Sequence, residues 1–322
     1  MRTTWRMIDP ELRLAGLVGK VLFPPSAGFF RLIHRMSRRT AGRNIHGLDC
    51  SERRIPSIDG GPDVRVRIYA PHSRSTDRPL PGVLFLHGGG YAIGSPEMSA
   101  PTYERLMRTR DCVIVAPDYR KSFDAAYPAA VNDSYATLLW LKKNAAALGV
   151  RKNQLLVMGQ SAGGGLTAAV ALMARDRGEV RIAFQMPLYP MIDDRMITES
   201  SRDNDAPLWG SRHNRVGWDL YLRELAGRDD VPKYAAAARE TDYAGLPPTA
   251  TFVGDLDPFR DETIQYVENL RAAGVPVEFR LFERCFHGFD LIRPGATISR
   301  EANAFMAEQF ASAVDGRFAD QP

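Results

Sequence analysis

Short runs of apolar residues alternate with longer amphipathic stretches from about residue 50 to the end of the chain. The continuous runs at 82–86 and 112–116 are typical of strands buried on both faces, whereas the alternation at 64–69 is typical of a half-buried strand. Further strands are predicted at 154–158, 180–187, 249–253 and 277–282. The pattern indicates a sheet whose central strands are covered on both sides.

Helices are predicted between these strands, where apolar residues recur at a spacing of three or four. They cover 129–148, the stretch that follows Ser161 and ends near Gly178, 261–273 and 297–314. This alternation predicts an α/β fold with a mostly parallel central sheet of about eight strands, flanked by helices.

Two segments interrupt the alternation. Residues 1–45 have amphipathic patterns broken at Pro24-Pro25, and residues 190–240 are irregular. We expect them to pack together as a helical cap over the active edge of the sheet, with exposed aromatic residues that include Phe30, Trp209 and Trp218. The predicted organisation is N-terminal cap helices at 1–46, a first core part at 47–189, a cap insertion at 190–233 and a second core part at 234–322.

Charge is unevenly distributed along the chain. Residues 1–43 carry nine Lys or Arg and two acidic residues, so this segment holds +7 while the whole chain holds +4. A solvated helix face explains this segment better than a nucleic-acid or membrane partner does. Residues 12–23 are apolar, but Arg13 and Lys20 interrupt them, so we expect neither a signal peptide nor stable membrane insertion.

Composition and cysteine usage point to an ordinary globular protein, with 44% hydrophobic and 25% charged residues. Cys50, Cys112 and Cys285 are far apart, odd in number and without a Cys-x-x-Cys pair. Such usage is typical of reduced thiols, so a cytoplasmic location is expected.

The most informative motif is Gly-x-Ser-x-Gly at 159–163, between the strand predicted at 154–158 and a helical stretch rich in Gly and Ala. A strand, a sharp turn and a helix in this order form a nucleophile elbow, where glycines flank the serine because larger side chains would collide with the backbone. Ser161 is therefore the candidate nucleophile. A serine hydroxyl also needs a base and donors for the developing oxyanion.

A glycine-rich loop, His87-Gly88-Gly89-Gly90-Tyr91, directly follows the strand at 82–86. Its N–H groups can turn toward a carbonyl oxygen, so Gly88 and Gly89, with Ala162 from the elbow, are the candidate oxyanion donors. A phosphate-binding loop is the alternative, but neither Gly-x-Gly-x-x-Gly nor Gly-Lys-Ser/Thr is present.

The base should be a histidine in a loop after the last strand. Of the six histidines, only His287 lies in such a loop, after the strand predicted at 277–282. His87 is expected to support the glycine loop by hydrogen bonds. The remaining histidines stand in basic or polar surroundings and are expected at the surface: His34, His46, His72 and His213.

The orienting acid should lie between the serine and the histidine, at the end of a strand. Asp255, Asp257 and Asp261 follow a predicted strand. Asp261 and Glu262 stand where a helix begins, so capping or the helix dipole explains them without catalysis. Asp255 is a credible competitor, but Pro258 holds Asp257 extended beyond the sheet edge, and Asp257 is the candidate.

Taken in order, the motifs His-Gly-Gly-Gly, Gly-x-Ser-Ala-Gly-Gly, Asp-Pro-Phe-Arg-Asp-Glu and His-Gly-Phe resemble those of the bacterial hormone-sensitive-lipase-like esterases. The resemblance runs from about residue 30 to the C-terminus and includes 118–120 and 127–130. It implies an α/β-hydrolase with an N-terminal helical cap. It also implies a role for each matching position: nucleophile Ser161, acid Asp257, base His287, and oxyanion N–H groups of Gly88, Gly89 and Ala162.

Two places depart from the pattern of that family. Gln160 stands before the serine, where family members commonly carry Asp, Glu or Thr, and Lys121-Ser122-Phe123-Asp124 replaces the usual Leu-Ala-Pro-Glu. Both lie around the elbow and outside the triad, so they bear on substrate preference and on the inner hydrogen bonds.

These observations predict a carboxylic ester hydrolase that forms an acyl-enzyme with small-molecule esters of short to medium acyl chain, without a metal or organic cofactor. An amidase, a lactonase or an acyltransferase could use the same triad. A non-catalytic hydrolase-like binding protein is disfavoured because nucleophile and base are both present. The expected substrate contacts are Tyr91, Trp209 and Phe30, with Tyr91 narrowing a site for about two to six carbons. The sequence leaves the oligomeric state open, and a homodimer is one alternative.

Overall fold

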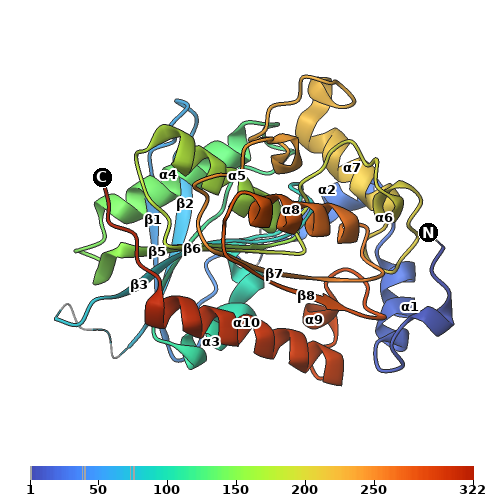
Figure 1. Cartoon of the computed structure of the whole chain (residues 1–322), viewed down its shortest axis with the longest axis horizontal. Helices are drawn as coiled ribbons and strands as arrows, with labels where there is room; N and C mark the ends of the chain where they lie inside the picture. The colour runs from blue at the N-terminus through green and yellow to red at the C-terminus, as the bar shows by residue number, and fades with distance from the viewer. Residues whose placement is uncertain (1, 38, 40, 73, 75–76) are drawn as a thin grey trace.

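The computed structural model describes residues 2–37, 39, 41–72, 74 and 77–322. Its strands are β1 (Leu48–Ile55), β2 (Val64–Pro71), β3 (Leu80–Leu86), β4 (Val113–Pro117), β5 (Val150–Gln160), β6 (Phe184–Leu188), β7 (Thr249–Gly254) and β8 (Val277–Phe282). They form one sheet in the order β1-β2-β4-β3-β5-β6-β7-β8 (Figure 1). β2 runs antiparallel to both of its neighbours, and all pairs from β4 to β8 are parallel.

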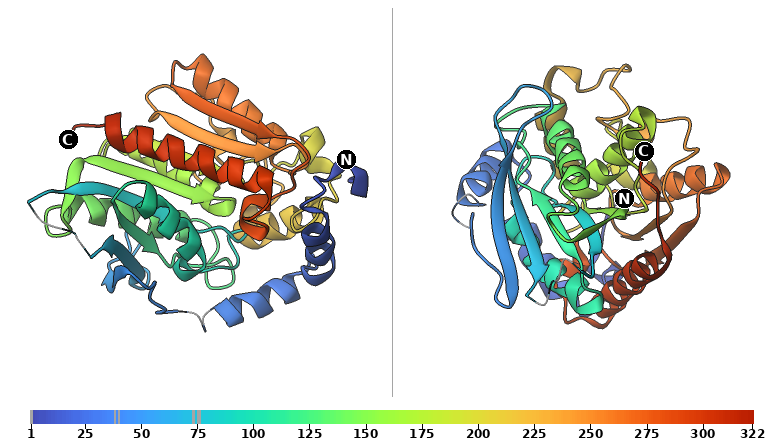
Figure 2. Two further views of the ribbon diagram at one scale, coloured as in Figure 1. Left: turned by 90° about the horizontal axis from the view of Figure 1, so that it is seen from below. Right: turned by 90° about the vertical axis from the view of Figure 1, so that its left-hand side faces the viewer.

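Helices cover both faces of this sheet. The α-helices are α1 (Arg13–Leu22), α2 (Ala27–Ser37), α3 (Ala100–Thr109), α4 (Ala129–Lys143), α5 (Ala162–Arg177), α6 (Glu199–Arg202), α7 (Ser211–Leu222), α8 (Arg260–Ala272), α9 (Phe289–Ile292) and α10 (Thr297–Gly316). Figures 1 and 2 show α4, α5 and α8 on one face and α3 beside α10 on the other. Within the described ranges, no helix has the length and apolarity needed to cross a lipid bilayer.

Side chains of the central strands alternate between two cores, one on each face of the sheet. In β5, Leu155 and Val157 join the core under α4 and α5, whereas Leu156 and Met158 join the core under α3 and α10. Successive side chains of a strand point to opposite faces, so a strand covered on both faces is apolar throughout. The predicted α/β fold with a mostly parallel, helix-flanked sheet is confirmed.

Several observed elements were not predicted, among them β1, α3 and the short helix α9. β1 was not predicted, because it is an edge strand whose only buried residue is Ile55 and its charged side chains face solvent. α3 was not predicted either, although Tyr103 and Leu106 on one of its faces are buried in the core. In addition, β6 begins at Phe184 and not at residue 180.

The N-terminal helices lie beside the segment 189–248, which links β6 to β7 and contains α6 and α7 (Figure 1). α1 approaches this segment through glycine: a Cβ at Gly19 would lie 2.7 Å from the Leu208 side chain. Phe30 of α2 stacks on Trp209 with ring centroids 5.6 Å apart. The expectation of exposed aromatics is therefore wrong for Phe30, Trp209 and Trp218, which are all buried.

The acidic residues at the start of α8 hold this segment against the core. Asp261 accepts a hydrogen bond from Ser200 N–H at 2.8 Å, and Glu262 Oε1 accepts one from Ile192 N–H at 2.9 Å. Capping or the helix dipole was predicted to explain both residues without catalysis, and these hydrogen bonds add a structural role that links α8 to the segment after β6. Glu262 is fully buried, and burial together with the charge of Asp193 raises the pKa of its carboxyl well above the ordinary value.

Replacing Glu262 with Gln should remove a pH-dependent cost of folding. Because the pKa of Glu262 is higher in the folded state, the folded protein holds more protons than the unfolded one, and stability falls as pH rises above about 4.3. Glutamine is neutral at every pH and keeps the oxygen that accepts the Ile192 N–H. We expect Glu262→Gln to exceed the wild type in unfolding free energy by about 1 kcal/mol or more at pH ~8, and by less at pH ~5.

Urea denaturation at both pH values measures this difference. Glu268→Gln is the matched control, because Glu268 is exposed on the same helix and should leave the pH dependence as it is. A Glu262→Gln variant that loses equal stability at both pH values would mean that the carboxyl is ionised in the folded protein.

Candidate active site

Ser161 occupies a sharp turn between β5 and α5. Its backbone has φ 58° and ψ −121°, a region that non-glycine residues rarely enter. The turn is possible because the chain around it is glycine: a Cβ at Gly163 would overlap the carbonyl oxygen of Leu86, and one at Gly159 would overlap that of Gly163. The strand, turn and helix predicted around the serine are therefore present.

The three side chains predicted as a triad form one hydrogen-bonded row. His287 Nε2 lies 2.8 Å from Ser161 Oγ, and His287 Nδ1 lies 2.7 Å from Asp257 Oδ2. Since a carboxylate only accepts, Nδ1 carries the proton and Nε2 is free to accept the serine proton. Asp257 is 1% exposed, and its second oxygen accepts Phe259 N–H at 2.9 Å.

Asp255, the competing acid, faces a different partner. Its Oδ1 accepts a hydrogen bond from Cys285 N–H at 3.1 Å, which ties the end of β7 to the loop before His287. Burial raises the pKa of Asp255. Asp255 therefore fixes the loop that carries the histidine, whereas Asp257 contacts the imidazole itself.

Aromatic rings hold the imidazole in place from two sides. Tyr189 and Phe259 both meet the His287 ring edge to face, with centroids 5.1 Å and 5.0 Å away. Such packing restricts rotation of the ring about its side-chain torsions. The orientation of His287 is thus set by Asp257 on one nitrogen and by these two rings.

The glycine loop after β3 lies directly beside the serine. A Cβ at Gly88 would lie 3.3 Å from the Ser161 Cβ, and Gly88 and Gly89 both line the cavity that contains Ser161. Ala162 is the first residue of α5 and follows the serine in sequence. The residues of the three candidate donors therefore lie near Ser161.

His87 supports this loop, as expected from its place in the sequence. Its Nδ1–H donates to Gly88 O at 2.8 Å, and its ring stacks on Tyr119 with centroids 4.3 Å apart. Tyr119 Oη–H donates to His87 O at 2.8 Å. Burial, with the nearby charge of Lys121, lowers the pKa of His87 to about 3, so the ring stays neutral at physiological pH.

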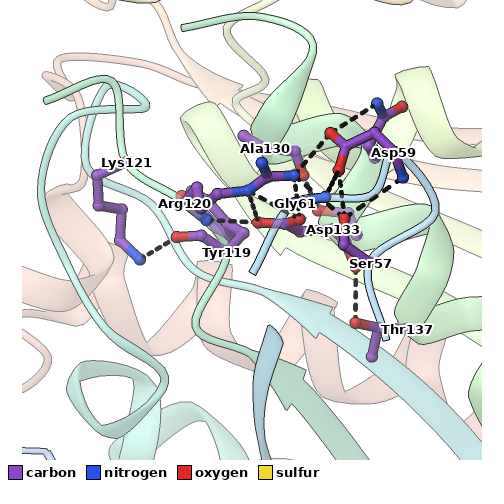
Figure 3. A network of polar contacts seen from close by, with 11 residues as sticks. Ser57, Asp59, Gly61, Tyr119, Arg120, Lys121, Ala130, Asp133 and Thr137 are labelled. Carbon is purple, nitrogen blue, oxygen red and sulfur yellow. Dashed lines mark hydrogen bonds and ion pairs between the residues drawn. The ribbon is translucent and has the colours of Figure 1, made fainter. Parts of the chain in front are cut away.

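The loop that carries Tyr119 is anchored by the ion pairs of the next residue. Figure 3 shows Arg120 bound to Asp133 and Asp59, with the shortest contacts at 2.7 Å and 2.8 Å. Lys121 is also buried and pairs with Asp118 at 2.8 Å. Arg120, from the part that resembles the family, and Lys121, the first residue of the departing stretch, thus fasten Tyr119 and through it the glycine loop.

A cavity of about 370 Å³ opens onto the serine. Its walls are mostly apolar and include Phe23, which follows α1, and Leu208 and Trp209 from the segment 189–248. Trp209 is therefore placed as predicted, on a wall of the cavity. Phe23 and Leu208 were missed, because a lone aromatic after α1 and a lone leucine carry no recognisable pattern.

Two predicted substrate contacts are corrected by their positions. Tyr91 is 1% exposed, donates its hydroxyl to Met191 O at 2.7 Å and stacks on Tyr221. Phe30 is fully buried behind Trp209. Among the described residues that line the cavity neither occurs, so both act as packing behind its walls.

Two histidines expected at the surface are buried. His213 is 9% exposed, donates from Nε2 to Phe23 O at 2.8 Å and stacks on the Phe23 ring. Burial lowers the pKa of His213. His34 is 8% exposed and pairs with Asp124 at 3.5 Å. Both join segments that are distant in sequence, and their polar sequence neighbours did not reveal this burial.

Gln160, the neutral residue before the serine, is buried and lines the cavity. Its Nε2 has no hydrogen-bond partner. Because the residue is glutamine, the site has no carboxylate at this position. Within the described ranges, no three His, Cys, Asp or Glu side chains are grouped closely enough to ligate a metal ion.

Comparisons with known proteins agree on the fold and its chemistry. The α/β-hydrolase fold model matches residues 83–291. Carboxylesterase NlhH of Mycobacterium tuberculosis is 33% identical over 299 residues, which are 90% of this chain and 92% of that protein. Esterase LipI of the same species is 34% identical over 239 residues, 72% of this chain and 73% of that protein.

Solved structures give the same result. A bacterial heroin esterase superposes with a TM-score of 0.86 at 37% identity, over 97% of this chain and 99% of the other. Esterase LipW of Mycobacterium marinum superposes with a TM-score of 0.83 at 30% identity, over 96% and 97%. Since these relatives are esterases and the matches span most of both chains, the chain belongs to the α/β-hydrolase family and is a carboxylesterase of its bacterial hormone-sensitive-lipase-like group.

Proposed function

We propose that the enzyme hydrolyses carboxylic esters through an acyl-enzyme formed on Ser161, with His287 as base and Asp257 as its orienting acid. The observation that carries this proposal is the row Ser161–His287–Asp257, with hydrogen bonds of 2.8 Å and 2.7 Å. Nucleophile, base and orienting acid each contact the next, as acyl transfer requires.

The reaction proceeds in two halves. Ser161 Oγ attacks the ester carbonyl carbon as His287 Nε2 takes the serine proton, and the N–H groups of Gly88, Gly89 and Ala162 hold the oxyanion. His287 then gives that proton to the leaving alcohol. Water, deprotonated by the same nitrogen, attacks the acyl-enzyme, and the carboxylic acid leaves as Ser161 recovers its proton.

Asp257 serves the histidine in both halves. Accepting Nδ1–H keeps the other nitrogen free, and the buried carboxylate stabilises the imidazolium formed when the proton moves. Its Oδ1 is already occupied by Phe259 N–H, so the carboxylate cannot rotate away from the ring.

The N-terminal helices and the segment after β6 act in this proposal as a cap that closes the acyl site. Support comes from Phe23, Leu208 and Trp209, which bring apolar cap side chains to the cavity wall. A cavity of about 370 Å³ that also holds the reacting carbonyl fits esters of short to medium acyl chain.

Replacing Ser161 with Ala should abolish turnover of p-nitrophenyl acetate and butyrate, because no other group near His287 can accept the acyl chain. We expect kcat/KM to fall by a factor on the order of 10⁴ or more. Initial rates measure this loss, and the thermal midpoint should stay nearly unchanged. Ser134→Ala, a buried serine of α4, is the matched control and should keep its activity. Organophosphate labelling at a serine other than Ser161 would refute the assignment.

Replacing Asp257 with Asn should lower kcat by roughly 10⁴-fold, because the amide presents a donor to Nδ1 and favours the wrong tautomer. Asp255→Asn should cost far less, since an asparagine oxygen can still accept Cys285 N–H. Steady-state kinetics of the two variants side by side distinguish the roles. If Asp255→Asn is the crippling change, the acid has been misassigned.

A further inference from the structure

One part of the catalytic cavity is polar in a way that the proposed reaction does not use. Arg105 of α3 and Asp290 of α9 both line the cavity that contains Ser161. Among the described residues, no hydrogen bond joins either side chain to Ser161 or to the glycine loop. The rest of the wall is dominated by apolar side chains, so two charged groups here require an explanation.

Asp290 is a buried carboxyl with an unused oxygen. It is 1% exposed, and its Oδ2 accepts a hydrogen bond from Tyr189 Oη at 3.3 Å. Its Oδ1 is buried without a hydrogen-bond partner. Burial raises the pKa of Asp290 to about 6, so the group is mainly ionised at neutral pH while one oxygen accepts nothing. Leaving such a group unsatisfied costs free energy unless a ligand completes it.

Arg105 carries the opposite charge and also has a buried polar atom without a hydrogen-bond partner. Its Nη1 is buried and has no hydrogen-bond partner. Burial lowers the pKa of Arg105, whereas the charge of Asp290 raises it, but a guanidinium remains protonated. The two charges therefore attract each other. Arg105 Nη1 and Asp290 Oδ1 each still lack a hydrogen-bond partner.

We propose that Arg105 and Asp290 form a polar subsite that binds a neutral hydroxyl or carboxamide group of the ester substrate, away from the reacting carbonyl. Such a group accepts a hydrogen bond from Arg105 and donates one to Asp290, for which the buried Nη1 and Oδ1 turn toward the cavity when the substrate binds. A carboxylate would be repelled by Asp290, an ammonium group would be repelled by Arg105, and an alkyl group would leave both unsatisfied. The subsite rests on the proposed function, because it names the substrate class of the same cavity.

The test compares polar esters with apolar esters of the same shape. Ethyl succinamate is paired with ethyl isohexanoate for the acyl side, and propanediol monoacetate with butyl acetate for the alcohol side. Acid release in a pH-stat at neutral pH gives kcat/KM for each ester. The ratio within a pair is independent of the fraction of active enzyme, so a partly misfolded variant can still be scored.

We expect the wild type to prefer the polar member of at least one pair by about tenfold or more, since hydrogen bonds to charged groups carry a preference of that order. Arg105→Met and Asp290→Asn should each bring the ratio toward one, mainly through KM of the polar ester. Arg108→Met is the matched control, because Arg108 lies on the same helix with its side chain 71% exposed. It should keep the wild-type ratio.

Each other outcome has a defined meaning. If the wild type hydrolyses none of the four esters, the proposed function fails. If it hydrolyses the apolar esters but shows no preference, or keeps its preference in both variants, the subsite is overturned and ester hydrolysis stands. If Asp290→Asn lowers kcat equally for both members of a pair, Asp290 acts through Tyr189 on His287 and is not a substrate contact. Arg105→Met then decides alone whether a polar subsite exists.

Discussion

The site depends on how closely backbone segments approach one another at Ser161. Ser161 N–H donates to Leu188 O at the end of β6 at 3.0 Å, and Ser161 O accepts Met191 N–H at 3.1 Å. On the other side, a side chain at Gly163 would overlap the carbonyl at the end of β3. The strained φ of the serine persists because these surroundings leave it no alternative. The ends of three strands are therefore brought together at one residue.

The charged side chains that anchor the glycine loop are paired. Asp133, which is 1% exposed, is matched by Arg120, and the pair anchors the loop that carries Tyr119. His87, which has no such partner, is held neutral at physiological pH by burial, and burial raises the pKa of Glu262 well above its ordinary value. Unpaired charge near the triad would oppose the imidazolium or the oxyanion in the low dielectric of the interior. Asp257 remains the carboxylate that contacts His287.

The fold and the hydrogen-bonded row Ser161–His287–Asp257 were predictable because each follows from local sequence. Strands buried on both faces are apolar throughout, and a nucleophile elbow needs glycine at fixed positions around the serine. β1 and α3 escaped prediction for a physical reason: an edge strand that buries only Ile55 carries no apolar pattern, and α3 takes its buried face from few residues. His213 escaped because its burial comes from Phe23, which is distant in sequence.

The walls of the cavity were less predictable, because they are assembled from segments that meet only in the folded chain. Tyr91 stands in the glycine loop and yet points behind it to Met191, whereas Phe23, from the turn after α1, reaches the cavity. The cavity wall therefore includes positions outside the motifs, such as Phe23, Leu208 and Arg105. Buried polar atoms without a hydrogen-bond partner mark two residues of this wall, Arg105 and Asp290, which line the cavity that contains Ser161. Unsatisfied polarity in an otherwise apolar wall is costly for the free enzyme and is offset only when a substrate completes it.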